Sequence, residues 1–97
     1  MNPSDTPKTI LLVEDDAIIA MEESAMLANN GYTTIVAYSG EEAVRFCAGR
    51  DEIDLVLMDI DLGGGMDGTE AAREILKTRD IPVLFLSSHT EKEIVDR

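Results

Sequence analysis

Acidic residues stand where two apolar runs end, and their side chains could bind a cation or a phosphoryl group. Glu14, Asp15 and Asp16 follow the first run, and Asp59 follows a later one. Carboxylates crowded into a partly buried site repel one another unless some are protonated or a cation neutralises them. With one His and one Cys in the chain, the oxygen donors select Mg²⁺, Mn²⁺ or Ca²⁺ over zinc or copper. A nearby hydroxyl would suit the cluster to phosphoryl transfer, with one carboxylate as nucleophile.

Short apolar runs alternate with helical patterns and would position these acids. Strands are expected at 8–13, 32–37, 53–58 and 82–86, with helices at 16–30 and after Ser39, Asp67 and Thr90. A β-α-β-α-β-α-β-α order implies right-handed crossovers and an α/β fold, a doubly wound parallel sheet with helices on both faces. Ligands bind such sheets beyond the carboxyl ends of the strands. The acids and the hydroxyls of Ser87 and Ser88 should therefore share one rim.

Local signals define the ends and the buried faces of the expected helices. Asp16 is placed to cap the first helix, and Gly31 is placed to end it in the left-handed conformation. Serine, aspartate or threonine followed three residues later by glutamate predicts capping boxes for the other helices. These pairs are Ser39 with Glu42, Asp67 with Glu70, and Thr90 with Glu93. The apolar stripe expected to face the sheet from the first helix comprises Ile18, Met21, Ala25 and Ala28, with Ile19 and Met26 beside it.

Composition narrows the class of protein. The chain has 97 residues, enough for one small domain, and a formal net charge of −12. That charge repels phosphate backbones and anionic lipid, so we expect binding to neither nucleic acid nor membranes. Cys47 is the single cysteine, which rules out an internal disulfide. Residues 1–7 are predicted to be a disordered lead and 8–97 to be the domain, in a cytoplasmic setting.

Three motifs, in order at the ends of successive strands, resemble the receiver (CheY-like) domain of two-component response regulators. They are ILLVEDD at 10–16, DLVLMD at 54–59 and PVLFLSS at 82–88. The resemblance implies a flavodoxin-like sheet with the strand order 2-1-3-4. It also implies a signalling phosphoacceptor, not a turnover enzyme. A sensor histidine kinase or a histidine phosphotransfer protein would phosphorylate Asp59.

The resemblance also implies roles for individual residues. Glu14 and Asp15 would be the acidic pair for Mg²⁺ or Mn²⁺, with Asp15 and Asp59 binding directly and Glu14 through water. The backbone carbonyl of Asp61 would be a further ligand. Ser87 would be the switch hydroxyl that bonds the phosphoryl group. The side chains of Asp61 and His89 would flank that group.

The chain departs from the family pattern in two places. Gly63 stands where receivers usually carry proline, four residues after the phosphoacceptor, so we expect a looser loop. The family's fifth strand, which ends in lysine, and its fifth helix are expected to be absent, because the chain stops ten residues after Ser87. We therefore expect a fragment of a longer protein. The exposed edge of its fourth strand could cause self-association.

Two alternatives stay open for Asp59. The segment 59–70 places oxygen ligands and a glycine at EF-hand spacing, although Asp67 and Glu70 also fit a capping box. An EF-hand needs a helix before this loop. A phosphatase of the haloacid-dehalogenase type could use Asp59 as nucleophile and Asp61 as acid and base. That family normally places the Asp pair after its first strand.

Overall fold

The computed structural model describes residues 7–60 and 62–86. Within them, four strands pair in parallel in the order β2-β1-β3-β4. The strands are β1 (Thr9–Val13), β2 (Thr33–Ala37), β3 (Leu55–Asp59) and β4 (Val83–Leu86). The helices are α1 (Ala17–Asn29), α2 (Gly40–Gly49) and α3 (Gly68–Thr78). The predicted α/β fold and the strand order 2-1-3-4 are confirmed, with each strand starting or ending within two residues of its expected bounds.

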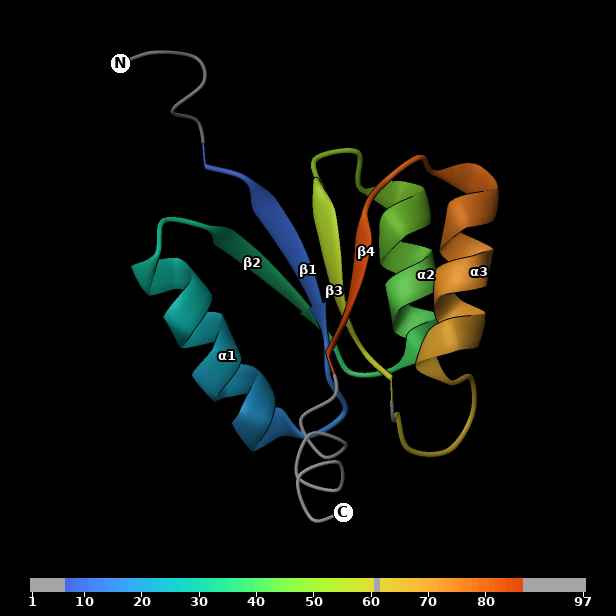
Figure 1. Cartoon of the computed structure of the whole chain (residues 1–97), viewed down its shortest axis with the longest axis horizontal. Coiled ribbons are helices and arrows are strands. Elements are labelled where there is room, and N and C mark those ends of the chain that lie inside the picture. The colour runs from blue at the N-terminus through green and yellow to red at the C-terminus, as the bar shows by residue number, and fades with distance from the viewer. Residues whose placement is uncertain (1–6, 61, 87–97) are drawn as a thin grey trace, which may run out of the picture.

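The helices lie on opposite sides of the sheet, as right-handed crossovers require. Figure 1 shows α1 on one side and α2 and α3 side by side on the other. The main core fills the space between the sheet and the α2–α3 pair. Its largest fully buried members include Leu11, Val56, Met58 and Ile75, and Cys47 lies among them. The central strands β1 and β3 are therefore apolar with little alternation.

The residues at the helix ends form caps nearly as predicted. Asp16 caps α1 by accepting from the N–H groups of Ile18 and Ile19, and Gly31 has a φ of +89°. The Asp67 capping box is complete. Ser39 caps α2, but Glu42 accepts from the N–H of Tyr38 at 2.8 Å, one residue before the position that a capping box requires. The caps set where each helix begins, and thus where each loop at the strand ends lies.

The predicted inner face of α1 is wrong. Ile18 and Met21, expected to face the sheet, are each 66% exposed, whereas Ala20 is buried and Ile19 and Leu27 are half-buried. The helix is apolar on most of its circumference, so periodicity alone does not single out one face. Asp16 instead sets the start of the helix, and packing against β1 and β2 sets its rotation. The expected stripe faces outward.

Arg79 ties the ends of three elements together. The arginine follows α3, and its guanidinium donates to the carbonyls of Cys47 at 2.8 Å, Arg50 at 3.1 Å and Ile53 at 2.9 Å. These carbonyls belong to the last turn of α2 and to the segment that leads into β3. The planar group with several donors suits such a cluster of acceptors. The contact holds the α2–α3 pair at the amino end of β3, opposite the acidic rim.

Several predicted features lie outside the described residues. They are residues 1–6 of the lead, Asp61, Ser87, Ser88, His89 and the third capping box, Thr90 with Glu93. Among the helices that are described, none has the length and apolarity needed to cross a bilayer.

Candidate metal and phosphoryl site

The parallel register of β1 and β3 brings the two acidic segments together. Val13 pairs with Met58, so the next residues, Glu14 and Asp59, leave neighbouring strands at the same level. The N–H of Glu14 still donates to the carbonyl of Ala37 on β2 at 3.0 Å, which holds the end of β1 in the sheet. Residues distant in sequence thus meet where the carboxyl ends of parallel strands form one rim.

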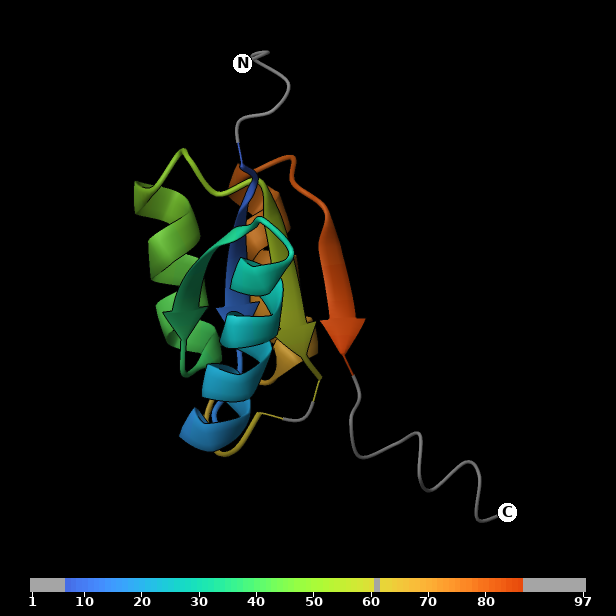
Figure 2. The same cartoon turned by 90° about the vertical axis from the view of Figure 1, so that its left-hand side faces the viewer.

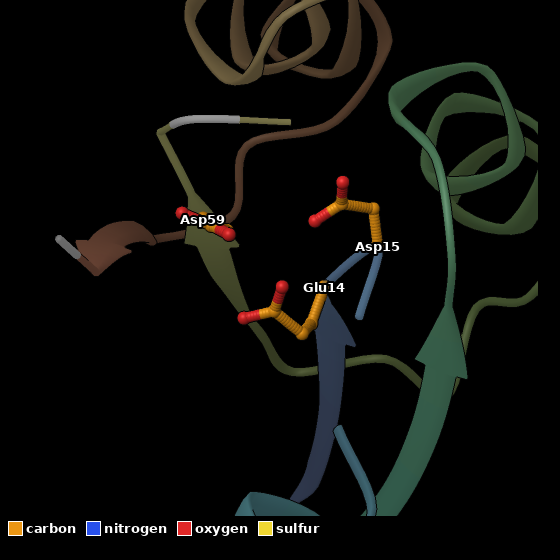
Figure 3. A group of neighbouring side chains, drawn as sticks. All are labelled: Glu14, Asp15 and Asp59. Atoms are coloured by element: carbon orange, nitrogen blue, oxygen red, sulfur yellow. The ribbon is translucent and has the colours of Figure 1, made fainter. Parts of the chain in front are cut away.

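Three carboxylates converge at this rim. One oxygen from each of Glu14, Asp15 and Asp59 lies within 4.8 Å of the other two. Figure 3 shows Glu14 and Asp15 reaching from the end of β1 toward Asp59 at the end of β3. Glu14 and Asp59 are each 4% exposed, whereas Asp15 is open to solvent. The cluster therefore has two buried members and one accessible from outside.

Burial governs the electrostatics of Glu14. It raises the pKa of this carboxyl from 4.5 to about 7, although the N–H of Asp16 donates to it at 3.2 Å and stabilises its charge. Neighbouring Asp59, and more weakly Asp15, raise the pKa of Glu14 further. The raised pKa of Glu14 shows that a negative charge on it is disfavoured by burial and by repulsion from the neighbouring acids. A cation bound there would relieve the repulsion.

Glu23 is an acidic group that sequence reasoning missed. It lies in the middle of α1, half-buried, and its Oε1 atom is buried without a hydrogen-bond partner among the described residues. Burial raises the pKa of Glu23, and the charges of Asp59 and Glu22 raise it further. The missed signal was a glutamate four residues after the half-buried Ile19, a spacing that puts both on one helix face. Glu23 therefore lies close enough to Asp59 for the charge of Asp59 to raise its pKa.

The loop after β3 contacts the site through its backbone. The N–H of Gly63 donates to Oδ2 of Asp15 at 3.0 Å, and the N–H of Met66 donates to Oε2 of Glu41 at 3.1 Å. The pKa of Glu41 is lowered by its own N–H and by that of Met66, because both stabilise its charged carboxylate. The loop is thus anchored at two points. The expectation that Gly63 makes this loop looser than in other receivers stays a prediction.

Two other acidic residues of the motifs lie away from the cluster, and two predicted site residues lie outside the described part. Asp16 caps α1, as predicted, and its Oδ1 is directed to the helix backbone. Asp54 lies at the opposite end of β3 and accepts from the N–H of Thr9 at 2.8 Å. Asp59 pairs with Leu86, the last residue of β4, whereas Ser87 and Asp61 lie outside the described residues.

The EF-hand alternative is wrong. Asp59 ends a strand of a parallel sheet, whereas an EF-hand loop follows a helix. The carboxylate of Glu70, the expected twelfth ligand, instead accepts from the N–H of Asp67 at 3.1 Å within the capping box. The phosphatase alternative is also disfavoured by position, since Asp59 follows the third strand along the chain.

Comparison with known proteins shows the same fold. An N-terminal domain of a response regulator/sensory box/GGDEF protein from Carboxydothermus hydrogenoformans is 44% identical, with a TM-score of 0.81, over 86% of this chain and 66% of that one. The receiver domain of the sensor histidine kinase PA1611 from Pseudomonas aeruginosa, solved with magnesium in its active-site cleft, is 31% identical. Its TM-score is 0.79, over 94% of this chain and 75% of that one.

Among curated proteins, the phyllosphere-induced regulator PhyR of Methylorubrum extorquens is 34% identical over 90 residues, which are 92% of this chain and 34% of that protein. Residues 10–97 match the family described as the response regulator receiver domain. The chain belongs to this family, which acts in two-component signalling. It spans less than half the length of the curated relatives that it matches.

Proposed function

We propose that the chain is a phosphoacceptor domain in a two-component phosphorelay and that Asp59 accepts the phosphoryl group. The convergence of Asp59 with Glu14 and Asp15 at the strand ends carries this proposal, because an acyl phosphate formed there would lie beside a cation site. Asp59 is nearly buried but reaches the rim. The membership of the chain in the receiver family supports the same chemistry.

Mg²⁺, or Mn²⁺ in its place, is the cation that we propose for this site. The donor set consists of hard carboxylate oxygens, and Mg²⁺ typically takes one or two of these and keeps room for water and phosphate oxygens. Asp15 and Asp59 would bind directly, Glu14 through water, and Asp61 through its backbone carbonyl. Bound there, the ion would offset the charge on the transferred group.

The protein's own part in the reaction is nucleophilic. A carboxylate oxygen of Asp59 would attack the phosphorus of a phosphohistidine, so that the O–P bond forms as the N–P bond breaks. The leaving imidazole takes up a proton. The hydroxyl of Ser87 would then donate to the phosphoryl group on Asp59. The domain would transfer a signal without turnover of a small substrate.

The partner that we propose is a sensor histidine kinase or a histidine phosphotransfer protein, in the cytoplasm. The outward stripe of α1, which begins beside Asp15 and Asp16, supports this assignment. It leaves apolar surface exposed along the helix at Ile18, Met21, Ala25 and Ala28, and its first turn lies next to the acid cluster, where a phosphoryl donor must dock. The net charge of −12 supports the expectation that nucleic acid and membranes are not partners.

The phosphoacceptor proposal can be tested on the full-length protein with acetyl phosphate and Mg²⁺. We expect one phosphoryl group per wild-type chain by intact mass spectrometry and none on Asp59→Asn, because the amide is not a nucleophile. Asp61→Asn is the matched control and should still be modified. Phosphorylation of Asp59→Asn, or turnover of p-nitrophenyl phosphate that Asp61→Asn abolishes, would contradict the proposal.

We also propose that the 97-residue chain can self-associate through β4. Among the described strands, β4 pairs with β3 alone, and Figure 2 shows its outer side facing away from the other described elements. Leu84 and Phe85 on this strand are 53% and 45% exposed. An open apolar edge favours pairing between chains, and salt should strengthen it by screening the negative charge.

Sedimentation of the 97-residue chain tests this proposal and should show dimers that Phe85→Lys abolishes. A monomer at every concentration would contradict the proposal.

A further inference from the structure

Carboxylates from two other elements hold the segment 62–66 at both ends. Asp15, directly after β1, accepts from the N–H of Gly63, and Glu41, in the first turn of α2, accepts from the N–H of Met66. The donor–acceptor distances are 3.0 Å and 3.1 Å. The segment therefore connects the acid cluster with the beginning of α2. Hydrogen bonds to a charged acceptor are stronger than neutral ones.

The glycines in this segment differ in what a side chain would meet. A Cβ atom at Gly63 would lie 2.9 Å from Oδ2 of Asp15. At Gly65 it would lie 2.9 Å from Oε2 of Glu41, and the φ of +83° also disfavours any side chain. A Cβ atom at Gly64 would meet nothing within 4 Å. The absence of a side chain thus matters for the approach to carboxylates at positions 63 and 65, but not at 64.

The Gly63 contact bears on the one exposed member of the acid cluster. Asp15 is open to solvent, so packing does not hold its carboxylate as it holds those of Glu14 and Asp59. The N–H of Gly63 engages one oxygen of Asp15. Hydrogen bonds of this kind orient carboxylate ligands and tune metal affinity. Glu41 fixes the far end of the segment, so the donor at Gly63 is itself held in place.

We propose that the backbone N–H of Gly63 is the positioning group that orients Asp15 for divalent-cation binding. The inference rests on the proposed function, because it adds a residue to the Mg²⁺ site assigned above. Proline, the residue usual at this position in receivers, has no N–H to donate. The contact therefore depends on the departure of this chain from the family pattern at position 63.

Isothermal titration of Mg²⁺ into the full-length wild type, Gly63→Ala and Gly64→Ala tests the proposal. We expect Gly63→Ala to bind Mg²⁺ about tenfold more weakly, the size of effect typical of lost outer-shell bonds, and Gly64→Ala to bind as the wild type does. Alanine keeps the backbone N–H, but its methyl group, 2.9 Å from Oδ2 of Asp15, would push this flexible carboxylate away from the donor and would meet no other atom within 4 Å. Metal-free Gly63→Ala should therefore unfold at nearly the wild-type urea concentration, which separates misplacement of Asp15 from loss of the fold.

The outcomes distinguish the two proposals. If the wild type binds Mg²⁺ and Gly63→Ala binds it equally well, the role of Gly63 is wrong and the proposed function stands. If the wild type does not bind Mg²⁺, both are wrong. Amide hydrogen exchange gives a second measurement that needs no glycine variant. The Gly63 amide should exchange more slowly than that of Gly64 and lose this protection in Asp15→Ala, whereas equal rates in the wild type would overturn the proposal.

Discussion

The free energy of unfolding of the metal-free protein is expected to fall by about 2 to 3 kcal/mol between pH 5 and pH 8. The reason is Glu14, whose pKa rises from 4.5 to about 7 on folding. Between these two values the folded state binds more protons than the unfolded state, so stability decreases as pH increases. The raised pKa of Glu23 acts in the same direction. The stabilisation is complete below pH 4.5 and is lost as the pH passes about 7.

Urea denaturation at a series of pH values measures this effect, and Glu14→Gln is the matched control. The amide keeps the shape of the side chain but does not ionise, so the decrease should shrink to the part that Glu23 contributes. Saturating Mg²⁺ should restore stability at pH 8, because a ligand that binds only the folded state stabilises it. A wild-type profile that is flat from pH 5 to pH 8, or one that runs parallel to that of Glu14→Gln, would contradict the prediction.

Gly68→Ala is expected to destabilise the protein by about 3 kcal/mol, at the upper end of the usual cost of overpacking. Gly68 begins α3 and is buried against the end of β3. A Cβ atom there would collide with the backbone carbonyl oxygen of Asp59 and lie 3.1 Å from both Cα of Ile60 and Cγ of Met58. The first two are backbone atoms, which cannot rotate away as a side chain can. The start of α3 or the end of β3 would have to move.

Gly49→Ala is the control for this prediction, because Gly49 ends α2 and a Cβ atom there would meet nothing within 4 Å. We expect a small gain of no more than about 1 kcal/mol from the better helix propensity of alanine. Urea denaturation midpoints, measured with and without Mg²⁺, give the stability of each variant in both conditions. Gly68→Ala should also weaken Mg²⁺ binding, because Asp59 moves with the end of β3. Wild-type stability for Gly68→Ala would show that Asp59 and α3 are not packed as described.

The order of helices and strands, and the acids that form the cluster at the strand ends, could be inferred from the sequence alone. Apolar runs without alternation, as in β1 and β3, are typical of strands buried on both faces, and such strands occur in parallel sheets. The side chains of Asp16 and Asp67 accept hydrogen bonds from N–H groups only two or three residues away. Their capping roles can therefore be predicted from the local sequence. The rule for the carboxyl ends of parallel strands then predicts that Glu14 and Asp59 lie together.

Contacts between segments distant in the sequence could be identified only from the folded structure. The rotation of α1 was mispredicted because its residues are apolar on most sides, and only packing against β1 and β2 selects the face that carries Glu23. The bond from Gly63 to Asp15 joins groups 48 residues apart. A glycine has no side chain to signal such a contact in a sequence. Local patterns record short-range hydrogen bonds and periodicity, whereas helix rotation and loop anchoring depend on surfaces that exist only once the sheet has formed.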